Sequence, residues 1–289
     1  MEVALTLIGR IGEALQRPEC VLTGPDGTLV VSNSRGGVTE IATGGRHTHR
    51  PCPGGAINGL AQDRDGALVL AGIDTGTVHL LRPDGTASLL LDRYEGERLG
   101  AVNFAHFDPT GSLWITVSTR SIPRSRAIEA PIPDGYVLKL TPGGPRLMAD
   151  GLCFANEIRF DASMRFAYLA ESALGRVLRF PVRPGGTLGP GRPFGPDPLF
   201  PGAIVDGLAF DAEGGLWVTE VTRNGIHRID RDGSACCLFE DPKAARLDFP
   251  ASIAFGGADW KSVFVGSIRM DHLLHFRSSV AGAPLWHHH

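Results

Sequence analysis

One pattern recurs six times along this 289-residue chain. Each copy contains a polar residue, a short apolar stretch, a turn that is usually rich in Asp or Gly, and a second β-rich run. Asp and Gly tolerate the positive φ of a tight turn, and the flanking Val, Leu, Ile, Trp and Phe suit buried strands, so each copy predicts a β-hairpin. The polar residues that open the six copies are Glu19, Asn58, Asn103, Asn156, Asp206 and Ser252.

A second series of strand-like segments alternates with these hairpins. Most of its members alternate apolar and polar residues, as a half-exposed strand does. The segments are residues 37–41, 76–80, 135–140, 175–180, 225–229 and 272–276. The repeat interval of about 39 to 53 residues is typical of four-stranded propeller blades. We therefore predict one all-β domain over residues 1–286, a six-bladed β-propeller with four-stranded antiparallel blades.

The two ends of the chain predict how the propeller closes. An apolar strand, Val3 to Ile8, precedes the first copy, whereas no strand clearly follows the sixth. We expect this N-terminal strand to complete the last blade, which removes sheet edges that would otherwise aggregate. The final residues His287, His288 and His289 could be the remains of an expression tag and are left out of the domain.

Composition excludes several other classes of protein. The chain has 28 Lys and Arg against 31 Asp and Glu, so no basic surplus indicates nucleic-acid binding. Its five cysteines form no Cys-x-x-Cys pair, which argues against structural zinc and disulfides and fits a reducing compartment. No apolar run is long enough to span a membrane, and residues 1–15 lack a secretory signal core. We expect a cytoplasmic protein that binds a small-molecule substrate and neither nucleic acid nor membrane; its oligomeric state stays open.

The six opening polar residues should meet near one end of the central channel, because the innermost strand of each blade lines it. Two carboxylates and up to three amide oxygens around one point form a hard-oxygen site, which suits Ca²⁺, Mg²⁺ or Mn²⁺ better than zinc. Asn and Asp before Gly are also ordinary turn residues, but the same register in six copies favours a functional ring. Within it, Asn58 and Ser252 are expected to line the pocket rather than to bind metal.

Three segments of the chain resemble a known family. Residues 205–218 are Val-Asp-Gly-Leu-Ala-Phe-Asp-Ala-Glu-Gly-Gly-Leu-Trp-Val, and residues 252–257 are Ser-Ile-Ala-Phe-Gly-Gly, with Val-Phe-Val at 263–265. Asn103 is followed by Phe-Asp-Pro-Thr-Gly-Ser-Leu-Trp at 107–114. These segments resemble the senescence-marker-protein, gluconolactonase and luciferin-regenerating-enzyme family of regucalcin-like lactonases, over nearly the whole chain.

The resemblance implies the roles of four ring residues. It implies that Glu19, Asn156 and Asp206 ligate one divalent metal ion and that Asn103 sits beside it, contacting substrate or metal. Ca²⁺ is the first expectation for the ion, with Mg²⁺, Mn²⁺ or Zn²⁺ as alternatives.

The chain departs from the family pattern in three places. Residues 17–20 are Arg-Pro-Glu-Cys where sugar-lactone enzymes usually have Gly-Glu-Gly-Pro, and residues 101–104 are Ala-Val-Asn-Phe in place of Arg-x-Asn-Asp. In the fourth copy, the usual Asn-Gly is Asn156-Glu157. The missing Arg and Asp would have contacted sugar hydroxyls or a carboxylate. Phe104 is expected to make the pocket more apolar, which argues against a sugar lactone.

A metal in this ring could polarise a lactone carbonyl, stabilise the developing oxyanion and lower the pKa of a bound water. Asp206 would serve as a ligand and as a general base. Glu157 is a second candidate base only if it points inward. The alternation of strand side chains predicts that Glu157 and Cys20 face away from the channel. His106 is expected to pack rather than to catalyse.

The longest interval between ring residues contains a candidate binding loop. Residues 118–134 are Pro-rich and carry Arg120, Arg124 and Arg126. Such a loop is either a lid or an exposed basic loop without a ligand. If it is a lid, an arginine, with Arg120 as first choice, would hold a substrate carboxylate. The predicted substrate contacts are Asn103, Phe104, Asn58, Arg120 and Ser252.

These observations predict a divalent-metal-dependent hydrolase of a small ester-like ring, first of all a lactonase. One alternative is another metal-assisted reaction on the same scaffold, such as phosphotriester hydrolysis or a non-hydrolytic ring opening, because propellers host many chemistries. The other is a non-enzymatic propeller that binds a metal, a ligand or a protein. The ring composition discriminates, because a pure interaction propeller has no need for carboxylates that converge on its axis.

Overall fold

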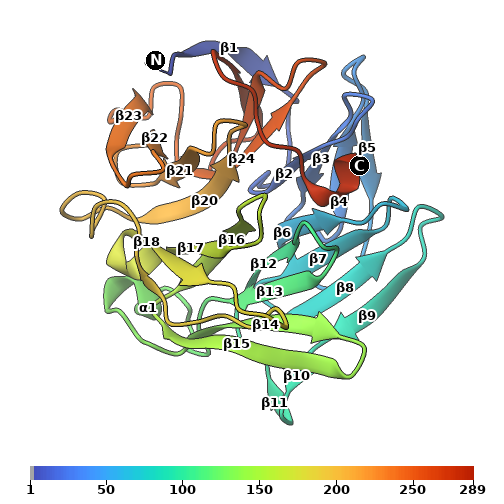
Figure 1. The fold of residues 1–289 in the computed structure, drawn as a ribbon. Helices are drawn as coiled ribbons and strands as arrows, with labels where there is room; N and C mark the ends of the chain where they lie inside the picture. The colour runs from blue at the N-terminus through green and yellow to red at the C-terminus, as the bar shows by residue number, and fades with distance from the viewer. Residues whose placement is uncertain (1–2) are drawn as a thin grey trace.

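The computed structural model describes residues 3–289. Six four-stranded antiparallel sheets surround a central axis in chain order (Figure 1). The predicted six-bladed β-propeller is therefore confirmed. Residues 1 and 2 of the predicted domain lie outside the described residues, and the interpretation of His287 to His289 as a tag remnant stays a prediction.

The first three blades each run from the channel outwards. Blade one consists of β2 (Val21–Thr23), β3 (Leu29–Ser32), β4 (Val38–Ile41) and β5 (His47–Arg50). Blade two consists of β6 (Ile57–Gln62), β7 (Leu68–Gly72), β8 (Thr77–Leu81) and β9 (Ala87–Leu91), and is followed by a short hairpin of β10 (Arg93–Tyr94) and β11 (Glu97–Arg98). Blade three consists of β12 (Val102–Phe107), β13 (Leu113–Val117), β14 (Gly135–Thr141) and β15 (Gly144–Leu152).

The last three blades repeat this order, except that the outer strand of the sixth comes from the other end of the chain. Blade four consists of β16 (Ala155–Phe160), β17 (Phe166–Glu171), β18 (Arg176–Pro181) and β19 (Arg192–Pro193). Blade five consists of β20 (Val205–Phe210), β21 (Leu216–Glu220), β22 (Gly225–Ile229) and β23 (Ala235–Glu240). Blade six consists of β24 (Pro250–Gly256), β25 (Ser262–Ser267), β26 (Leu273–Ser278) and β1 (Leu5–Ile11).

The N-terminal strand closes the ring as predicted, although it lies slightly later in the sequence than expected. β1 pairs antiparallel with β26, from Leu5 opposite Ser278 to Ile11 opposite Leu273. Its side chains alternate between half-buried and exposed, as suits the outer strand of a blade. Blade six therefore joins the two ends of the chain in one sheet.

The Asp of the repeated turn holds the hairpins of blades three and five by the same contacts. Asp108 accepts a hydrogen bond from Trp114 Nε1 at 2.7 Å, and Asp211 accepts one from Trp217 Nε1 at 3.0 Å. Both tryptophans are fully buried. Full burial of a large apolar side chain contributes about 1.5–3 kcal/mol. The Asp of the turn therefore accepts a hydrogen bond from the indole N–H, the one polar group of a tryptophan side chain that fills the core between blades.

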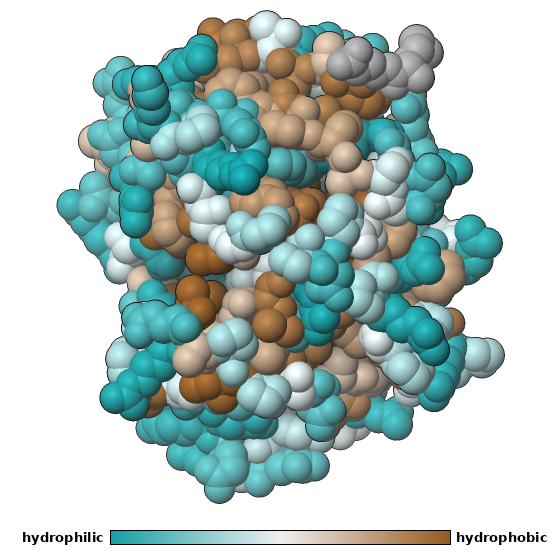
Figure 2. Space-filling model, turned by 90° about the vertical axis from the view of Figure 1, so that its left-hand side faces the viewer, coloured by the Kyte–Doolittle hydropathy of each residue, from teal (hydrophilic) through white to brown (hydrophobic). Residues whose placement is uncertain are grey.

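The helices of the described chain are short and lie outside the blades. They are α1 (Arg126–Glu129) and the 3₁₀ helices η1 (Ser172–Leu174) and η2 (Trp286–His288). No helix among residues 3–289 is long and apolar enough to cross a membrane. Figure 2 shows the side of the propeller on which β18 and β23 lie in Figure 1, where polar residues surround patches of apolar ones.

Candidate functional site

The ring residues lie at irregularities of the innermost strands. In five inner strands the pairing register shifts near the start, where one strand carries extra unpaired residues. These shifts enclose the opening polar residues of copies two to six: Asn58, Asn103, Asn156, Asp206 and Ser252. A β-bulge re-aims side chains and releases backbone from the ladder. The bulges therefore explain why side chains near the ring do not follow simple strand alternation.

Glu19, Asn58 and Asn103 form one side of the ring. All three are buried, and Asn58 Nδ2 donates to the main-chain oxygen of Asn103 at 3.3 Å. Arg17, one of the departures from the family pattern, reaches the same point. Its Nη2 lies 2.5 Å from Glu19 Oε2 and donates to Asn58 Oδ1 at 3.0 Å. Arg17 thus places a positive charge inside the predicted metal site.

Asn156 and Asp206 form the facing part of the ring. Asn156 Nδ2 donates to Ser172 Oγ at 3.0 Å. Burial raises the pKa of Asp206 well above its usual range, and the charges of Glu19 and Glu157 raise it further, whereas Arg17 and a hydrogen bond from Asn156 oppose the shift. Burial also raises the pKa of Glu19, against the opposing charge of Arg17. The three implied ligands are therefore within electrostatic reach of one another.

Glu157 lies in the channel, and the expectation that it faces away is wrong. It is buried, accepts a hydrogen bond from the main-chain nitrogen of Leu208 at 3.1 Å, and pairs with Arg159 at 2.7 Å. Burial raises the pKa of Glu157 to about 7, although the Arg159 charge lowers it. The bulge between Ala155 and Ile158 is the physical reason, because it breaks the alternation on which the prediction depended.

Cys20 also lies in the channel, contrary to the prediction. Burial raises the pKa of its thiol, and the Glu157 carboxylate raises it further. A hydrogen bond from Ser252 lowers this pKa. Because Cys20 belongs to blade one and Glu157 to blade four, these groups approach each other across the axis. With Arg159 they form a second polar layer below the ring, and the ring residue Ser252 contacts both Cys20 and Glu157.

Two predicted substrate contacts are placed elsewhere. Phe104 is buried in this second layer, where the guanidinium of Arg159 lies 4.5 Å from its ring centre, so its position does not favour a substrate contact at the ring. Arg120 is held by its own loop: its main-chain nitrogen donates to Asp134 Oδ2 at 3.0 Å, and its guanidinium lies 4.1 Å from the ring centre of Tyr136. Phe104 is buried against Arg159 of another blade, which no local sequence pattern links to it, whereas Arg120 is exposed and contacts residues at the end of its own loop.

Arg124, rather than Arg120, is the arginine of the 118–134 loop that influences the ring. Its guanidinium forms an ion pair with Asp74, and the charges of both residues act on the pKa of Glu19. The loop therefore approaches the end of the channel that holds the ring. The sequence indicates that an arginine of the 118–134 segment could contact the site, but nothing in the segment distinguishes Arg124 from Arg120.

The opposite end of the channel is covered by the C-terminal segment. Trp286 lies there, with the guanidinium of Arg64 at 3.5 Å from its ring centre. A cavity of about 660 Å³ is lined by this segment and by residues such as Phe160 and Tyr168, but by none of the six ring residues. This cavity and the cluster of buried carboxylates are therefore at different ends of the channel.

The ring fits a divalent cation by its donor set. Two buried carboxylates with raised pKa and an amide form a set of oxygen donors that a hard cation would stabilise. Glu19 Oε2 is buried and accepts no hydrogen bond, although Arg17 lies close enough for an ion pair. The contrary feature is the Arg17 guanidinium, which must move aside or remain beside an ion held by Glu19, Asn156 and Asp206.

These features define a propeller with a buried ring of carboxylates and amides on its axis. A model of the SMP-30/gluconolactonase/LRE-like region matches residues 18–269. The chain belongs to this family, which confirms the resemblance. No curated protein matches the chain in sequence.

Three solved structures with the same fold have low sequence identity to this chain. A calcium-binding protein, regucalcin, from Agrobacterium tumefaciens is 22% identical with a TM-score of 0.76, covering 99% of both chains. A gluconolactonase from Xanthomonas campestris is 22% identical with a TM-score of 0.75, covering 96% of this chain and 95% of the other. A virginiamycin B lyase from Staphylococcus aureus is 14% identical with a TM-score of 0.65, covering 96% and 99%. At these identities the similarity shows the fold alone.

Proposed function

We propose that this protein is a divalent-metal-dependent hydrolase of a small lactone, with its catalytic centre at the axial ring. The observation that carries the proposal is the meeting of Glu19 and Asp206, two buried carboxylates from blades one and five, with Asn156 beside them. Membership of a family named for gluconolactonase supports the reaction class. The regucalcin relative described as calcium-binding supports Ca²⁺ as the first ion to test.

Glu19, Asn156 and Asp206 would hold the ion, which would polarise the lactone carbonyl and activate water. Asp206 is the first candidate for the proton acceptor, because burial and neighbouring carboxylates raise its pKa. Glu157, whose pKa is raised to about 7, is a second group that can exchange a proton near neutral pH. Asn103 and Asn58 supply amides that orient the substrate beside the carboxylates.

Arginine side chains favour a substrate with an anionic group. Arg17 contacts two ring residues, and Arg124 acts electrostatically on Glu19 from the 118–134 loop. Charge-assisted hydrogen bonds from arginine recognise carboxylates with defined geometry. We therefore assign the carboxylate-binding role first considered for Arg120 to Arg124, and we place Ser252 in the layer below the substrate.

The test is hydrolysis of a panel of sugar, aliphatic and aromatic lactones by metal-stripped protein, with each divalent ion added back. We expect metal-restored activity that Asp206→Asn abolishes and that Asp232→Asn, a matched change at an exposed turn, leaves intact. Metal-independent turnover, or turnover unchanged in Asp206→Asn, would contradict the proposal.

Elimination without water is the second candidate, because three solved structures of the same fold are lyases. The two reactions differ in the origin of the product oxygen. Reaction in ¹⁸O-labelled water followed by mass spectrometry decides between them: hydrolysis incorporates one labelled oxygen into the product and elimination incorporates none.

A further inference from the structure

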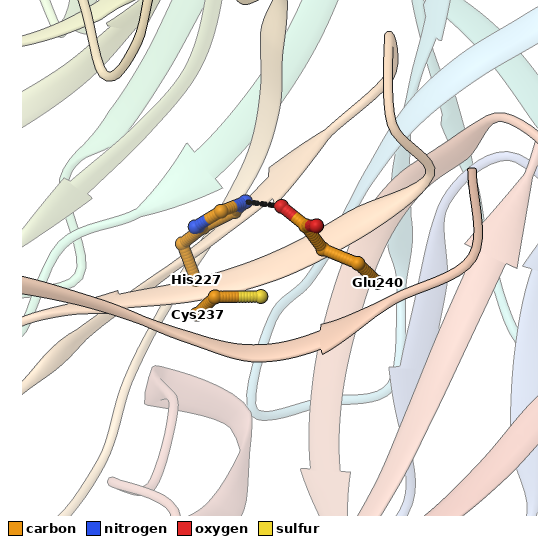
Figure 3. Close-up of side chains that lie close together, drawn as sticks. All are labelled: His227, Cys237 and Glu240. Atoms are coloured by element: carbon orange, nitrogen blue, oxygen red, sulfur yellow. Dashed lines mark ion pairs between the residues drawn. The ribbon is translucent and has the colours of Figure 1, made fainter.

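Three side chains with different ligand atoms lie together on the outer half of blade five. His227 is on β22, whereas Cys237 and Glu240 are on the neighbouring strand β23 (Figure 3). One nitrogen, one sulfur and one carboxylate oxygen from these residues all lie within 4.8 Å of one another. We propose that His227, Cys237 and Glu240 form a second cation site, separate from the axial ring, for a borderline-soft divalent ion, with Zn²⁺ as the ion of best fit.

A bulge between the two strands brings the three side chains to one face. His227 is paired with Cys237, while Ile226 is paired with Phe239, so the register shifts between these pairs. In a regular strand, Cys237 and Glu240 would lie on opposite faces, because they are three residues apart. The extra residue at the bulge reverses the alternation and places both beside His227.

Gly225 leaves the space into which the imidazole points. It is paired with Glu240 on the neighbouring strand. A Cβ atom at Gly225 would lie only 2.8 Å from His227 Nε2. Any side chain at this position would therefore push the imidazole away from Glu240 and Cys237.

His227 offers an unused ligand atom in the protonation state that metals require. The side chain is buried, and Nε2 has no hydrogen-bond partner. This atom points toward Glu240, whose Oε1 is 3.8 Å away (Figure 3). Burial lowers the pKa of His227, although Glu220 and Glu240 oppose that shift, so the ring is neutral at neutral pH. An orphaned buried nitrogen is costly unless a partner satisfies it.

The distances suit an ion after a small adjustment. Zinc bonds of about 2.0–2.3 Å to N, O and S place tetrahedral ligand atoms about 3.3–3.8 Å apart. Glu240 is half-buried and Cys237 is exposed, so these two side chains can move toward the fixed imidazole, and the fourth position would face solvent. The mixed N, S and O donors select Zn²⁺ over Ca²⁺ or Mg²⁺. Two factors oppose binding: Arg223 Nη1 lies 3.7 Å from Glu240 Oε1, and burial together with Glu240 raises the pKa of the Cys237 thiol to about 11.

The probe is Co²⁺, which replaces Zn²⁺ and gives an ultraviolet charge-transfer band only when a thiolate is bound. The full-length reduced protein is titrated with Co²⁺, and the band is then displaced by Zn²⁺. We expect the band in the wild type and its loss in Cys237→Ser. It should persist in Cys236→Ser, the matched control, because strand alternation directs Cys236 to the opposite face of β23. The terminal His287 to His289 can also bind Co²⁺, but they contribute no sulfur.

Two further variants separate a metal site from a fortuitous cluster. His227→Gln should weaken Zn²⁺ binding at this site at least about tenfold, and Gly225→Ala should weaken it while retaining all three ligands. Asp206→Asn should leave the band unchanged, because the axial ring has no part in it. Absence of the band in the wild type, its dependence on Cys236 rather than Cys237, or an unchanged affinity in a folded His227→Gln variant would each overturn the proposal.

Discussion

The axial ring and the blade-five cluster place ligand atoms around a point by different means. The ring collects oxygen donors from several blades, is buried, and has a nearby arginine, Arg17, in ion-pair contact with Glu19. The blade-five cluster takes three unlike donors from two adjacent strands and is open to solvent at Cys237. The arrangement of the ring residues therefore depends on the closure of the whole propeller, whereas that of the cluster depends on one bulge within one sheet.

The largest expected effect is on the ring. Asp206→Asn removes one carboxylate charge and the candidate proton acceptor, so we expect lactone turnover to fall about 10²–10⁴-fold. Steady-state kinetics on the best substrate of the panel measures the loss. The cobalt–thiolate band should be unchanged in the same sample. A simultaneous loss of both would show that the two regions are not independent.

The next effect is on the pH dependence of stability in the metal-free protein. The pKa of Glu157 is raised from 4.5 to about 7, so the folded state binds the proton more tightly than the unfolded state. The resulting stabilisation is complete below about pH 4.5 and is lost as the pH rises through 7. The contribution of this group is about 3 kcal/mol. Urea unfolding between pH 5 and 8 should show the decline, and Glu157→Gln should flatten it; an equal decline in the variant would contradict the assignment.

A smaller effect should follow removal of the positive charge of Arg17, which lies beside the ring. Arg17→Gln leaves Glu19 without its ion-pair partner, so an added divalent cation gains more from binding there. We expect calcium affinity to rise about tenfold, which corresponds to about 1.4 kcal/mol. Calorimetric titration measures the change. A fall in affinity would instead show that Arg17 supports the site.

The smallest effect should come from the same kind of change at blade five. Arg223 lies near Glu240 and over the ring of Phe200, at 4.0 Å from its centre. Arg223→Gln removes one partly exposed charge, so we expect only a several-fold increase in Zn²⁺ affinity, because solvent screens surface charges. Competition with a metal indicator measures it. If Arg223→Gln raised Zn²⁺ affinity by a larger factor than Arg17→Gln raises calcium affinity, the charge of Arg223 would not be the better screened of the two, contrary to the proposal.

The repeated pattern was sufficient to predict the blades, the closure by the N-terminal strand and the location of the six opening polar residues at or beside the inner strands; their roles toward a metal or a substrate stay predictions. Side-chain direction could not be predicted in the same way. Glu157 was assigned to the wrong side because strand alternation holds only where the register is regular, and Cys20 because it precedes β2, which begins at Val21. Arg17 and Arg124 reach the ring from loops, whose conformation depends on distant contacts. The His227 cluster has no sequence signal, because its members come together through a register shift.

The closure of blade six has a consequence for how the protein is made. β1 is made before the strands of blades one to five, and its partner β26 is made after them. The sixth sheet therefore cannot be completed until the other five blades have been synthesised, and pairing between strands so far apart in the sequence is slow to form. During that time blades one to five lack their closing neighbour. The newborn chain thus carries its ligand residues before it has a channel in which to assemble them.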